Sequence, residues 1–464
     1  MVTDSDRAAA GGNDREQSAA TEAAGTPDND AAAQRRQKRQ RLIDAGVDPY
    51  GQGYEFSDHL SDLVENFQGL AAGEDSDYRT SVVGRIMARR DQGKLLFLMI
   101  RDSTAEIQLF VRADAFSDSR FADIKDLDVG DWVGVCGLVV RTRRGQLSIA
   151  PDQIQLLAKS LRPLPEKFHG LADKELRYRQ RYVDLMMNPE VRATFEKRFA
   201  IVAMLRQVAQ ERGFIEVETP MLHPIPGGAT ARPFVTHHHA LDRDFYLRVA
   251  PELNLKRLLV GGFERIFEIN RNFRNEGMDP THNPEFTTFE AYQAFSDLAG
   301  MRDLTRELIQ RCCLVANGSL QISYQGQAID LGGEWPSRTM IELTSAAAGE
   351  DVSFNRTLTE LKILANHYQI TLQESWNKGK IIAELYEKLV EPNLLQPVFV
   401  TEHPLEISPL AKPKAQDPNV TERFELVIAG SEYANAFSEL NDPVDQQQRF
   451  TAQQAAKAAG DDEA

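Results

Sequence analysis

Several polar residues between residues 263 and 293 have the chemistry of a binding site. Apolar and polar side chains alternate over residues 263–276, which predicts a strand with one face on a core. The turn-forming segment GMDPTHNPE follows, and a second alternating run places Phe286, Glu290 and Tyr292 on one face. We therefore expect an antiparallel hairpin whose polar face is either solvated or part of a site.

The residue types on this face favour a site for a nucleotide and an amine. Arg274 offers a planar, two-pronged donor for a phosphate, and Phe286 offers an aromatic surface for a purine. Glu290 and Tyr292 supply a carboxylate and a hydroxyl that suit an amine. A charged group of this composition opposite an apolar face indicates the floor of a nucleotide pocket.

A second acidic stretch covers residues 423–439, RFELVIAGSEYANAFSE. Its carboxylates Glu425, Glu432 and Glu439 are seven residues apart, which on a helix would form one acidic stripe. The large apolar residues around Gly430 favour two strands with a bend instead. Carboxylates inside a strand are costly to bury unless a cation lies between them, and Mg²⁺ with nucleotide phosphates supplies one.

Three further segments carry weaker signals. Glu252 follows a proline at a predicted helix start, where helix capping and a role in a site are both consistent with the sequence. The loop at residues 225–234, IPGGATARPF, has two glycines that let the backbone approach a small ligand. Residues 237–239 are all histidine, but consecutive residues of a strand point to opposite faces, which argues against a zinc site.

The elements that position these residues fall into five parts. Residues 1–33 have almost no large apolar side chains and are expected to be a disordered tail. Residues 34–75 begin with a basic helix, QRRQKRQRLIDAG, which is either a solvated face or a phosphate-contacting one. Residues 76–160 contain short alternating strands, residues 161–190 form a proline-containing linker and helix, and residues 191–464 form a second, larger domain.

The alternating runs between residues 80 and 157 predict a small closed β-barrel of the OB type. Such barrels bind single-stranded nucleic acid by stacking bases on aromatic side chains next to cations. Arg89, Phe97, Gln108 and Phe110 have suitable chemistry, although two phenylalanines alone are more often part of a core. The barrel is therefore a candidate nucleic-acid interface.

Composition excludes several classes of protein. The chain has 464 residues and a net charge of −16, so it is not a polycation that binds nucleic acid through its overall charge. No apolar run approaches the roughly 20 residues of a membrane span, and the N-terminus has no secretory pattern. Three cysteines do not make a disulfide framework. We expect a cytoplasmic protein with no membrane association.

Several motifs resemble those of a known family. GFIEVETPML is similar to motif 1 of the class II aminoacyl-tRNA synthetases, and FRNEGMDPTHNPEFTTFEAY is similar to their motif 2. The segments IPGGATARPF, LRVAPELNLKRL and ANAFSELNDP resemble the bacterial lysyl-tRNA synthetases. The resemblance runs from about residue 35 to the end of the chain, with the motifs in the family's order.

The resemblance implies an α+β multidomain fold. An N-terminal OB barrel would bind the anticodon, and a class II catalytic domain would be built on a mainly antiparallel sheet flanked by helices. The implied activity is the ATP-dependent conversion of L-lysine to lysyl-adenylate, with Mg²⁺, followed by transfer to the 3′ end of tRNA(Lys). The resemblance also implies a homodimer.

Roles carried over from the family cover three sites. Arg274 would act in catalysis by holding the α-phosphate of ATP, and the rest of the ATP site would be Glu276, His282 and Phe286, with Glu425 and Glu432 as Mg²⁺ ligands. The lysine site would consist of Gly228, Glu252, Glu290, Tyr292, Asn435, Phe437 and Glu439. The anticodon site would include Arg89, Phe97 and Gln108.

The sequence departs from the family at one motif. Family members carry a Gly-rich run ending in an arginine that grips the γ-phosphate of ATP, and no G-x-G-x-G-x-D-R occurs here. We therefore expect the catalytic domain to lack its C-terminal motif 3 segment. The alternative is a catalytically inactive paralogue that binds tRNA or forms dimers. A third possibility, lysylation of another acceptor, is disfavoured by the barrel.

Overall fold

The computed structural model describes residues 27–51, 53–165, 173–225, 227–229, 231–279 and 281–458. The chain divides into two compact units, residues 1–189 and 190–464. Most of the predicted tail, residues 1–26, lies outside the described residues, but its last part is helical because α1 (Pro27–Asp44) starts before Gln34. Much of the expected linker, residues 166–172, also lies outside them.

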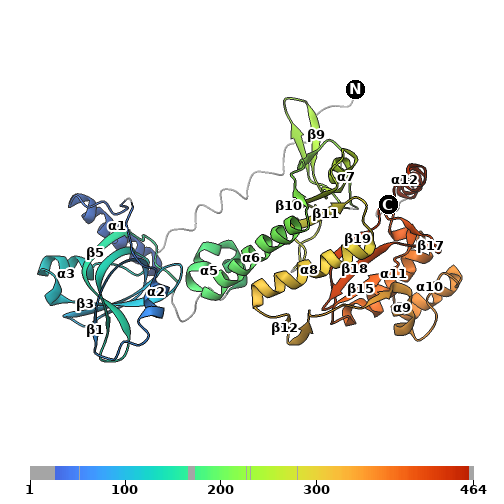
Figure 1. Ribbon diagram of the computed structural model, residues 1–464. Coiled ribbons are helices and arrows are strands. Elements are labelled where there is room, and N and C mark those ends of the chain that lie inside the picture. The colour runs from blue at the N-terminus through green and yellow to red at the C-terminus, as the bar shows by residue number, and fades with distance from the viewer. Residues whose placement is uncertain are drawn as a thin grey trace, which may run out of the picture. The chain divides into compact units, whose positions relative to one another are not determined.

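The first unit is built around a closed barrel with strand order β1-β2-β3-β5-β4 (Figure 1). Its only parallel pair among the described strands is β3 with β5. The elements after α1 are α2 (Leu60–Asn66), β1 (Asp75–Asp91), β2 (Leu95–Arg101), β3 (Glu106–Arg112), η1 (Ala113–Ala115), α3 (Asp118–Lys125), β4 (Trp132–Arg141), β5 (Leu147–Ala158), α4 (Lys174–Arg179) and α5 (Arg181–Met187). The five strands predicted from the alternating runs are confirmed.

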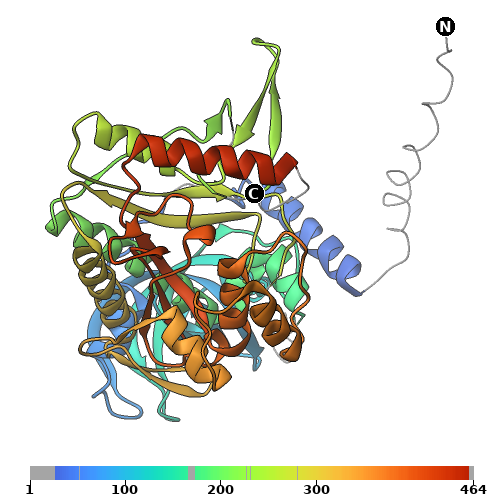
Figure 2. The ribbon, with the colours of Figure 1, turned by 90° about the vertical axis from the view of Figure 1, so that its right-hand side faces the viewer.

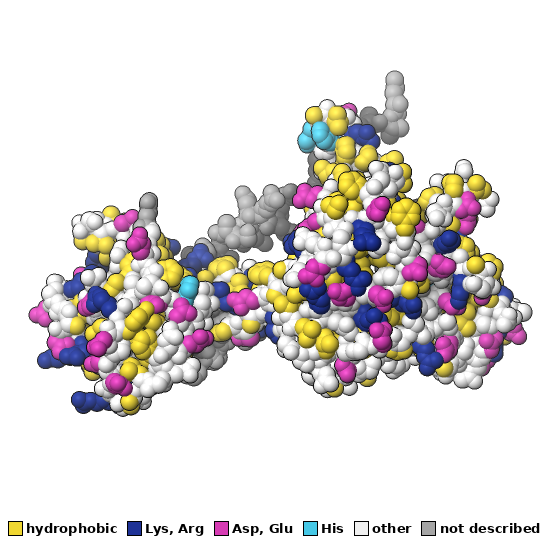
Figure 3. Space-filling view, in the orientation of Figure 1, with side chains coloured by type: hydrophobic (Ala, Val, Ile, Leu, Met, Phe, Trp, Pro, Cys, Tyr) yellow, Lys and Arg dark blue, Asp and Glu magenta, His cyan; other side chains and the backbone are white. Residues whose placement is uncertain are grey.

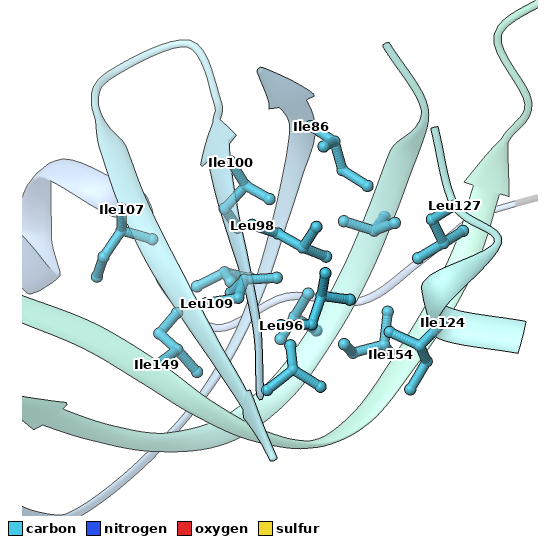
Figure 4. Close-up of a cluster of buried hydrophobic side chains, with 14 of the residues drawn as sticks. Ile86, Leu96, Leu98, Ile100, Ile107, Leu109, Ile124, Leu127, Ile149 and Ile154 are labelled. Atoms are coloured by element: carbon cyan, nitrogen blue, oxygen red, sulfur yellow. The ribbon is translucent and has the colours of Figure 1, made fainter. Parts of the chain in front are cut away.

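The barrel core follows from the alternation of side chains along each strand. In β2 every second residue is buried, so that Leu96, Leu98 and Ile100 point inward. Figure 4 shows these side chains meeting those of β3 and β5 inside the barrel, with Ile124 of α3 packed against them. Ser117 caps α3 by accepting a hydrogen bond from the backbone N–H of Arg120.

The basic helix α1 pairs with acidic side chains of its own unit. Lys38 Nζ lies 2.8 Å from Asp128 and 3.3 Å from Asp126, and Arg41 lies 3.1 Å from Asp126. Lys38 is therefore engaged within the unit at 20% exposure, whereas the Arg41 side chain remains 67% exposed. The sequence left both interpretations open because the aspartates lie far along the chain.

The second unit contains several small sheets and surrounding helices. Its N-terminal half consists of α6 (Pro189–Glu211), β6 (Ile215–Glu216), β7 (Leu222–His223), β8 (Val235–His238), β9 (Arg243–Leu247), α7 (Glu252–Val260), β10 (Arg265–Phe273), β11 (Glu285–Gln293) and α8 (Leu298–Asn317). Here β11-β10-β6 and β7-β9-β8 form two three-stranded sheets. The extended run around Pro220 thus gives two very short strands, because proline lacks the N–H that a continuous ladder needs.

The C-terminal half holds a four-stranded sheet of order β14-β15-β18-β19. Its elements are β12 (Gln321–Tyr324), β13 (Gln327–Asp330), β14 (Ser337–Thr339), α9 (Met340–Ala348), α10 (Leu358–His367), α11 (Lys378–Leu389), η2 (Glu391–Asn393), β15 (Val398–Thr401), η3 (Leu405–Ile407), β16 (Pro413–Lys414), β17 (Asp417–Thr421), β18 (Arg423–Ile428), β19 (Ser431–Phe437) and α12 (Pro443–Ala458). No helix within the described segments has both the length and the hydropathy needed to cross a bilayer.

Both faces of this sheet are covered. Phe399 and Phe424 pack with residues of α8 on one face, whereas Val400 and Val427 pack with α9–α11 on the other. Figure 2 shows the strands between α8 and the α9–α11 group. Because successive residues alternate between faces, Glu425 shares the face that α11 covers.

The β10–β11 hairpin has the predicted antiparallel pairing. Its two faces differ less in burial than expected, because Glu268 and Asn272 on the polar face are buried along with Phe267 on the apolar face. Glu268 is paired with Arg248, whose Nη1 lies 2.9 Å from the carboxylate, and Thr219 donates a second hydrogen bond to it. A buried charge needs such partners, so the polar face of this hairpin is enclosed by the protein.

Candidate functional site

Three elements far apart in the sequence bring the predicted residues together in the second unit. Strand β11 carries Glu290 and Tyr292, the first turn of α7 carries Glu252, and Glu439 follows β19. The charges of Glu252 and Glu439 both raise the pKa of Tyr292, which indicates that these groups share one region. The prediction that they converge is therefore supported by the geometry.

Carboxylates surround an ammonium group at this place. Lys256 Nζ lies 2.6 Å from Glu252 Oε1 and 2.6 Å from Glu439 Oε2. The same Nζ lies 5.6 Å from the centroid of the Phe437 ring, within cation–π range. We call Glu252, Glu439 and Phe437 the ammonium cage. Lys256 was not singled out in the sequence.

The cage and its neighbours have shifted pKa values. Desolvation and the nearby charge of Glu252 raise the pKa of Glu290 to about 7, although the Tyr292 hydroxyl donates a 3.3 Å hydrogen bond to it. Desolvation also raises the pKa of Glu439. The pKa of Lys256 is raised as well, because both carboxylates outweigh the effect of its burial. Two carboxylates thus share one cation here, next to a third carboxyl group that is hard to ionise.

Gly228 lies against the cage. It has a φ of +96°, which favours glycine, and a Cβ at this position would lie 3.5 Å from Glu252 Cβ. The loop that carries it is tied to the β10–β11 turn, because Asn275 donates a 2.7 Å backbone hydrogen bond to Arg232 and the Arg232 N–H lies 3.4 Å from Glu276 Oε1. The predicted close approach of this backbone to a ligand site is therefore compatible with the structure.

A second group of residues has the features of a phosphate and base site. The Arg274 guanidinium stacks over the Phe286 ring at 5.2 Å, and its Nε is buried without a hydrogen-bond partner among the residues that the structure describes. Such an orphaned donor needs an acceptor. His282 is exposed and its Nδ1 is bound to Asp279 at 2.7 Å. The described contacts do not join His282 to Arg274.

Glu425 and Glu432 form a pair of interacting carboxylates. Desolvation and the charge of Glu425 raise the pKa of Glu432 to about 7, while Arg423 and Arg274 act in the opposite direction. Burial opposes the ionisation of Glu425, but His403 and Arg423 still hold its pKa at about 2. A cation beside Glu432 would lower its pKa again.

Mg²⁺ fits this pair only with help from other donors. Carboxylate oxygens are ligands that Mg²⁺ prefers, with phosphates and water completing the shell. No cluster of three or more acidic, histidine or cysteine side chains suitable for a metal occurs among the described residues. The three consecutive histidines of the described residues likewise form no such cluster, and His237 pairs with Asp244 at 2.9 Å.

Two residues near these carboxylates were not predicted from the sequence as site residues. Arg423 contacts Glu425 and donates a 3.1 Å hydrogen bond to the predicted site residue Asn435. His403 is almost fully buried, with Nε2 3.3 Å from Glu425. The sequence signal for Arg423 was its position two residues before Glu425 on one strand face. His403 has no local signal, because its burial depends on distant segments.

The candidate nucleic-acid face of the barrel is formed by β2 and β3. Phe97 and Phe110 stack at 5.5 Å and are partly exposed, whereas their neighbours on each strand, Leu96, Leu98, Leu109 and Val111, point into the core. Of the two alternatives that the sequence left open, the partial exposure of both rings favours a stacking surface over a core position. Arg89 is exposed and donates to the Lys125 carbonyl, whereas Gln108 is buried and donates a 2.9 Å hydrogen bond to Ser148.

Comparison with known families finds two matches along the chain. Residues 173–464 match the family of tRNA synthetases class II (D, K and N). Residues 80–164 match the OB-fold nucleic acid binding domain. The second match covers the five-stranded barrel, and the first covers the elements that carry the ammonium cage and the Arg274–Phe286 pair.

The chain is also similar to curated proteins over most of its length. It is 49% identical over 433 residues to a lysine–tRNA ligase of Pelotomaculum thermopropionicum, covering 92% of this chain and 84% of that protein. It is 47% identical over 428 residues to the lysine–tRNA ligase of Carboxydothermus hydrogenoformans, covering 92% and 87%. For that of Staphylococcus aureus the identity is 46% over 433 residues, covering 92% and 88%. The chain therefore belongs to the class II tRNA synthetases of the D, K and N group, and within them to the lysine–tRNA ligases.

Proposed function

We propose that the protein activates L-lysine with ATP and transfers the lysyl group to the 3′ end of tRNA(Lys). The observation that carries the proposal is the ammonium cage, whose two carboxylates both lie 2.6 Å from an ammonium nitrogen. Free lysine carries a side-chain ammonium with a pKa near 10.4. A neutral side chain of similar length would leave the carboxylates unpaired and be rejected.

The lysine site extends from the cage to the reacting end of the amino acid. Glu252, Glu439 and Tyr292 would bind the side-chain ammonium, with Phe437 against its stem. Glu290 would accept a hydrogen bond from the α-amino group, and Asn435 and the Gly228 backbone would hold the amino-acid head. These roles are supported by the proximity of Glu290 to Glu252 and by the closeness of Gly228 to the same residue.

The ATP site would adjoin the part of the lysine site that holds the amino-acid head. Arg274 would bind the α-phosphate through its unpaired donor, Phe286 would stack on adenine, and Glu276 and His282 would complete the loop around the nucleotide. A lysine carboxylate oxygen attacks the α-phosphorus, a P–O bond forms, and pyrophosphate leaves with the electron pair of the bond that breaks.

Glu425 and Glu432 would hold Mg²⁺, which when bound would offset negative charge on the phosphates. Arg274 would stabilise the charge that develops on the α-phosphate, so positioning and electrostatics supply the rate without a covalent nucleophile.

The barrel would bind the anticodon of tRNA(Lys). Phe97 and Phe110 form a stacked, partly exposed aromatic surface with Arg90 over Phe97 at 5.1 Å. Bases stack on such surfaces next to cations. Arg89 is exposed and precedes Arg90 on β1, but it would have to release the Lys125 carbonyl, as Gln108 would have to break its hydrogen bond to Ser148, to reach a base.

A homodimer is proposed from the exposed apolar side chains of the second unit. Figure 3 shows hydrophobic side chains over the region of β9 and α7. Exposed fractions are 47% for Leu222, 59% for Val235, 90% for Val260 and 64% for Phe199. Large apolar side chains that are this exposed are candidates for an interaction surface. We place the protein in the cytoplasm because its proposed substrates, tRNA and ATP, are there.

The proposal is tested by lysine-dependent exchange of labelled pyrophosphate into ATP. Because the sequence has no Gly-rich run ending in arginine, the assay uses this chain and a version extended by that segment of a relative. Lysine-dependent exchange by either supports the proposal. Exchange by neither contradicts it.

Two arginines of the β10–β11 hairpin provide a matched pair of variants. Arg274→Gln should lower the exchange rate about 10²–10³-fold, the effect of losing one donor to a charged transition state. Arg271→Gln removes an exposed arginine that pairs with Glu285, and it should exchange at nearly the rate of the unmodified protein. Equal rates for both variants would contradict the role of Arg274.

A further inference from the structure

The ammonium in the cage belongs to the protein itself. Lys256 lies on α7 one turn after Glu252, and its Nζ is 2.6 Å from the carboxylates of both Glu252 and Glu439. An i,i+4 ion pair explains the contact with Glu252 alone. Glu439 comes from a segment after β19, so the ammonium joins two distant parts of the fold.

This position coincides with the one that the proposed function gives to the substrate. The inference therefore rests on that function, in which Glu252, Glu439 and Phe437 hold the ammonium of free lysine. Lys256 occupies all three partners at once, with its Nζ also 5.6 Å from the Phe437 ring. Two ammonium groups within about 4 Å would repel each other strongly in so enclosed a place. One of them must leave when the other enters.

We propose that Lys256 acts as an internal substitute for the substrate ammonium, holding the cage together when the pocket is empty and leaving when lysine binds. Without a cation, Glu252 and Glu439 would face each other with like charges. Lys256 supplies that cation, so the cage keeps its shape before the ligand arrives. It is a positioning residue that also competes with the ligand.

The side chain of Lys256 is suited to leaving. It is 24% exposed, which gives its flexible stem a route to solvent, whereas Glu252 is only 11% exposed and stays enclosed. A lysine ammonium is a compact charge on four methylenes and is strongly hydrated once outside. The carboxylates remain in place and exchange one ammonium for another, so the charge of the cage is conserved.

The test compares equilibrium binding of L-lysine, measured by calorimetry without ATP, among variants of the full chain. Lys256→Met keeps the stem and removes the competing charge. If Lys256 fills the cage more than nine-tenths of the time, its removal should tighten lysine binding about tenfold or more. Norleucine, which has no terminal ammonium, should gain no affinity from the same change.

Two further variants separate competition from other effects. Arg257→Met removes the next cation of α7, which contacts Asn254 and not the cage, and should leave lysine affinity unchanged. Lys256→Arg keeps the charge but can grip a carboxylate with two donors, so it should bind lysine more weakly than the unmodified protein. This variant also keeps the test decisive if Lys256→Met fails to fold.

The outcomes distinguish this inference from the proposed function. Unchanged or weaker lysine binding by Lys256→Met, or unchanged binding by Lys256→Arg, would overturn the inference while leaving the function in place. A similar gain by Arg257→Met would also overturn it, because the effect would then be general attraction. Failure of the unmodified protein to bind lysine would contradict the proposed function and with it the inference.

Discussion

At the scale of single residues, the site is governed by carboxylates that are hard to ionise. Glu290 and Glu432 both have pKa values raised to about 7, in each case by desolvation first and by a neighbouring glutamate second. Perturbed carboxylates of this kind gather at functional sites because ligands, rather than the folded protein alone, supply the compensating charge. The protonation state of the site near neutral pH therefore depends on what is bound.

Lysine binding should strengthen as the pH rises through 7. Glu290 is protonated below its raised pKa of about 7, and its hydrogen bond to the charged α-amino group is strong only when the carboxylate is ionised. Between pH 6 and 8 this single group should lower the dissociation constant about tenfold. Calorimetry at several pH values measures it, and Glu290→Gln should give weaker binding with a flatter profile. A profile of unchanged slope in that variant would contradict the role of Glu290.

Glu290 should give the stability of the ligand-free protein the opposite pH dependence, with stability falling as the pH rises. In the unfolded chain Glu290 ionises near its ordinary pKa, whereas in the fold it keeps its proton up to about pH 7. Between those values the unfolded state binds fewer protons, so the contribution of Glu290 to the stability of the ligand-free protein falls as the pH rises. Added lysine should reduce this loss, because its ammonium groups favour the ionised form.

At the scale of elements, the sheet β11-β10-β6 is joined to β9 by a buried ion pair. Arg248 and Glu268 are 1% and 2% exposed, and Thr219 bonds to both of them. Arg248 Nε also donates a 2.8 Å hydrogen bond to the Arg271 carbonyl. Glu268 lies directly opposite Glu290 in the hairpin and shares its face, so this network borders the residues of the site and helps to fix their positions.

Arg248→Met should lower the free energy of unfolding of the second unit by about 3–5 kcal/mol, because it leaves the charge of Glu268 buried without a cation. The matched control is Arg206→Met, which breaks a 2.9 Å pair with Glu216 that is 40% and 32% exposed and should cost less than about 1 kcal/mol. Urea unfolding is followed by the fluorescence of Trp335 and Trp376 in a Trp132→Phe background. Equal losses in both variants would contradict the importance of the buried pair.

The secondary-structure elements were easier to predict from the sequence than the contacts between them. The hairpin over residues 263–293 follows from a period-two alternation, and the one over residues 423–439 from its strand-favouring apolar residues around Gly430; both are local information. The ion pair of Arg248 and the cage position of Lys256 depend on contacts between distant segments. Lys256 follows Glu252 by four residues and therefore looks like one more surface pair of a helix. Its second carboxylate partner, Glu439, is visible only in the folded chain.

At the scale of the whole molecule, recognition of tRNA and activation of lysine are assigned to different units. The barrel has its own core, built from residues such as Leu98 and Ile154. The cage and the Arg274–Phe286 pair lie entirely in the second unit. Substitutions on the barrel surface should therefore affect only those steps that involve tRNA.

Phe97→Ala should lower kcat/KM for tRNA in lysylation roughly tenfold or more, because a stacked base is worth about 1–3 kcal/mol. Lysine-dependent pyrophosphate exchange without tRNA should stay at the level of the unmodified protein. Leu138→Ala, at another exposed apolar position of the barrel, is the control and should change neither rate. If Leu138→Ala weakened lysylation as much as Phe97→Ala did, the assigned anticodon face would be incorrect.

The contact of Lys256 with Glu252 and Glu439 has a consequence for other amines in the cell. Diamines such as putrescine carry a terminal ammonium of the same kind, and an anionic pocket left open would attract them. A diamine must first dislodge Lys256, and it lacks the carboxylate that an amino acid offers to the rest of the site. The proposed role of Lys256 would thus also limit blockage of the site by diamines, without a separate gate.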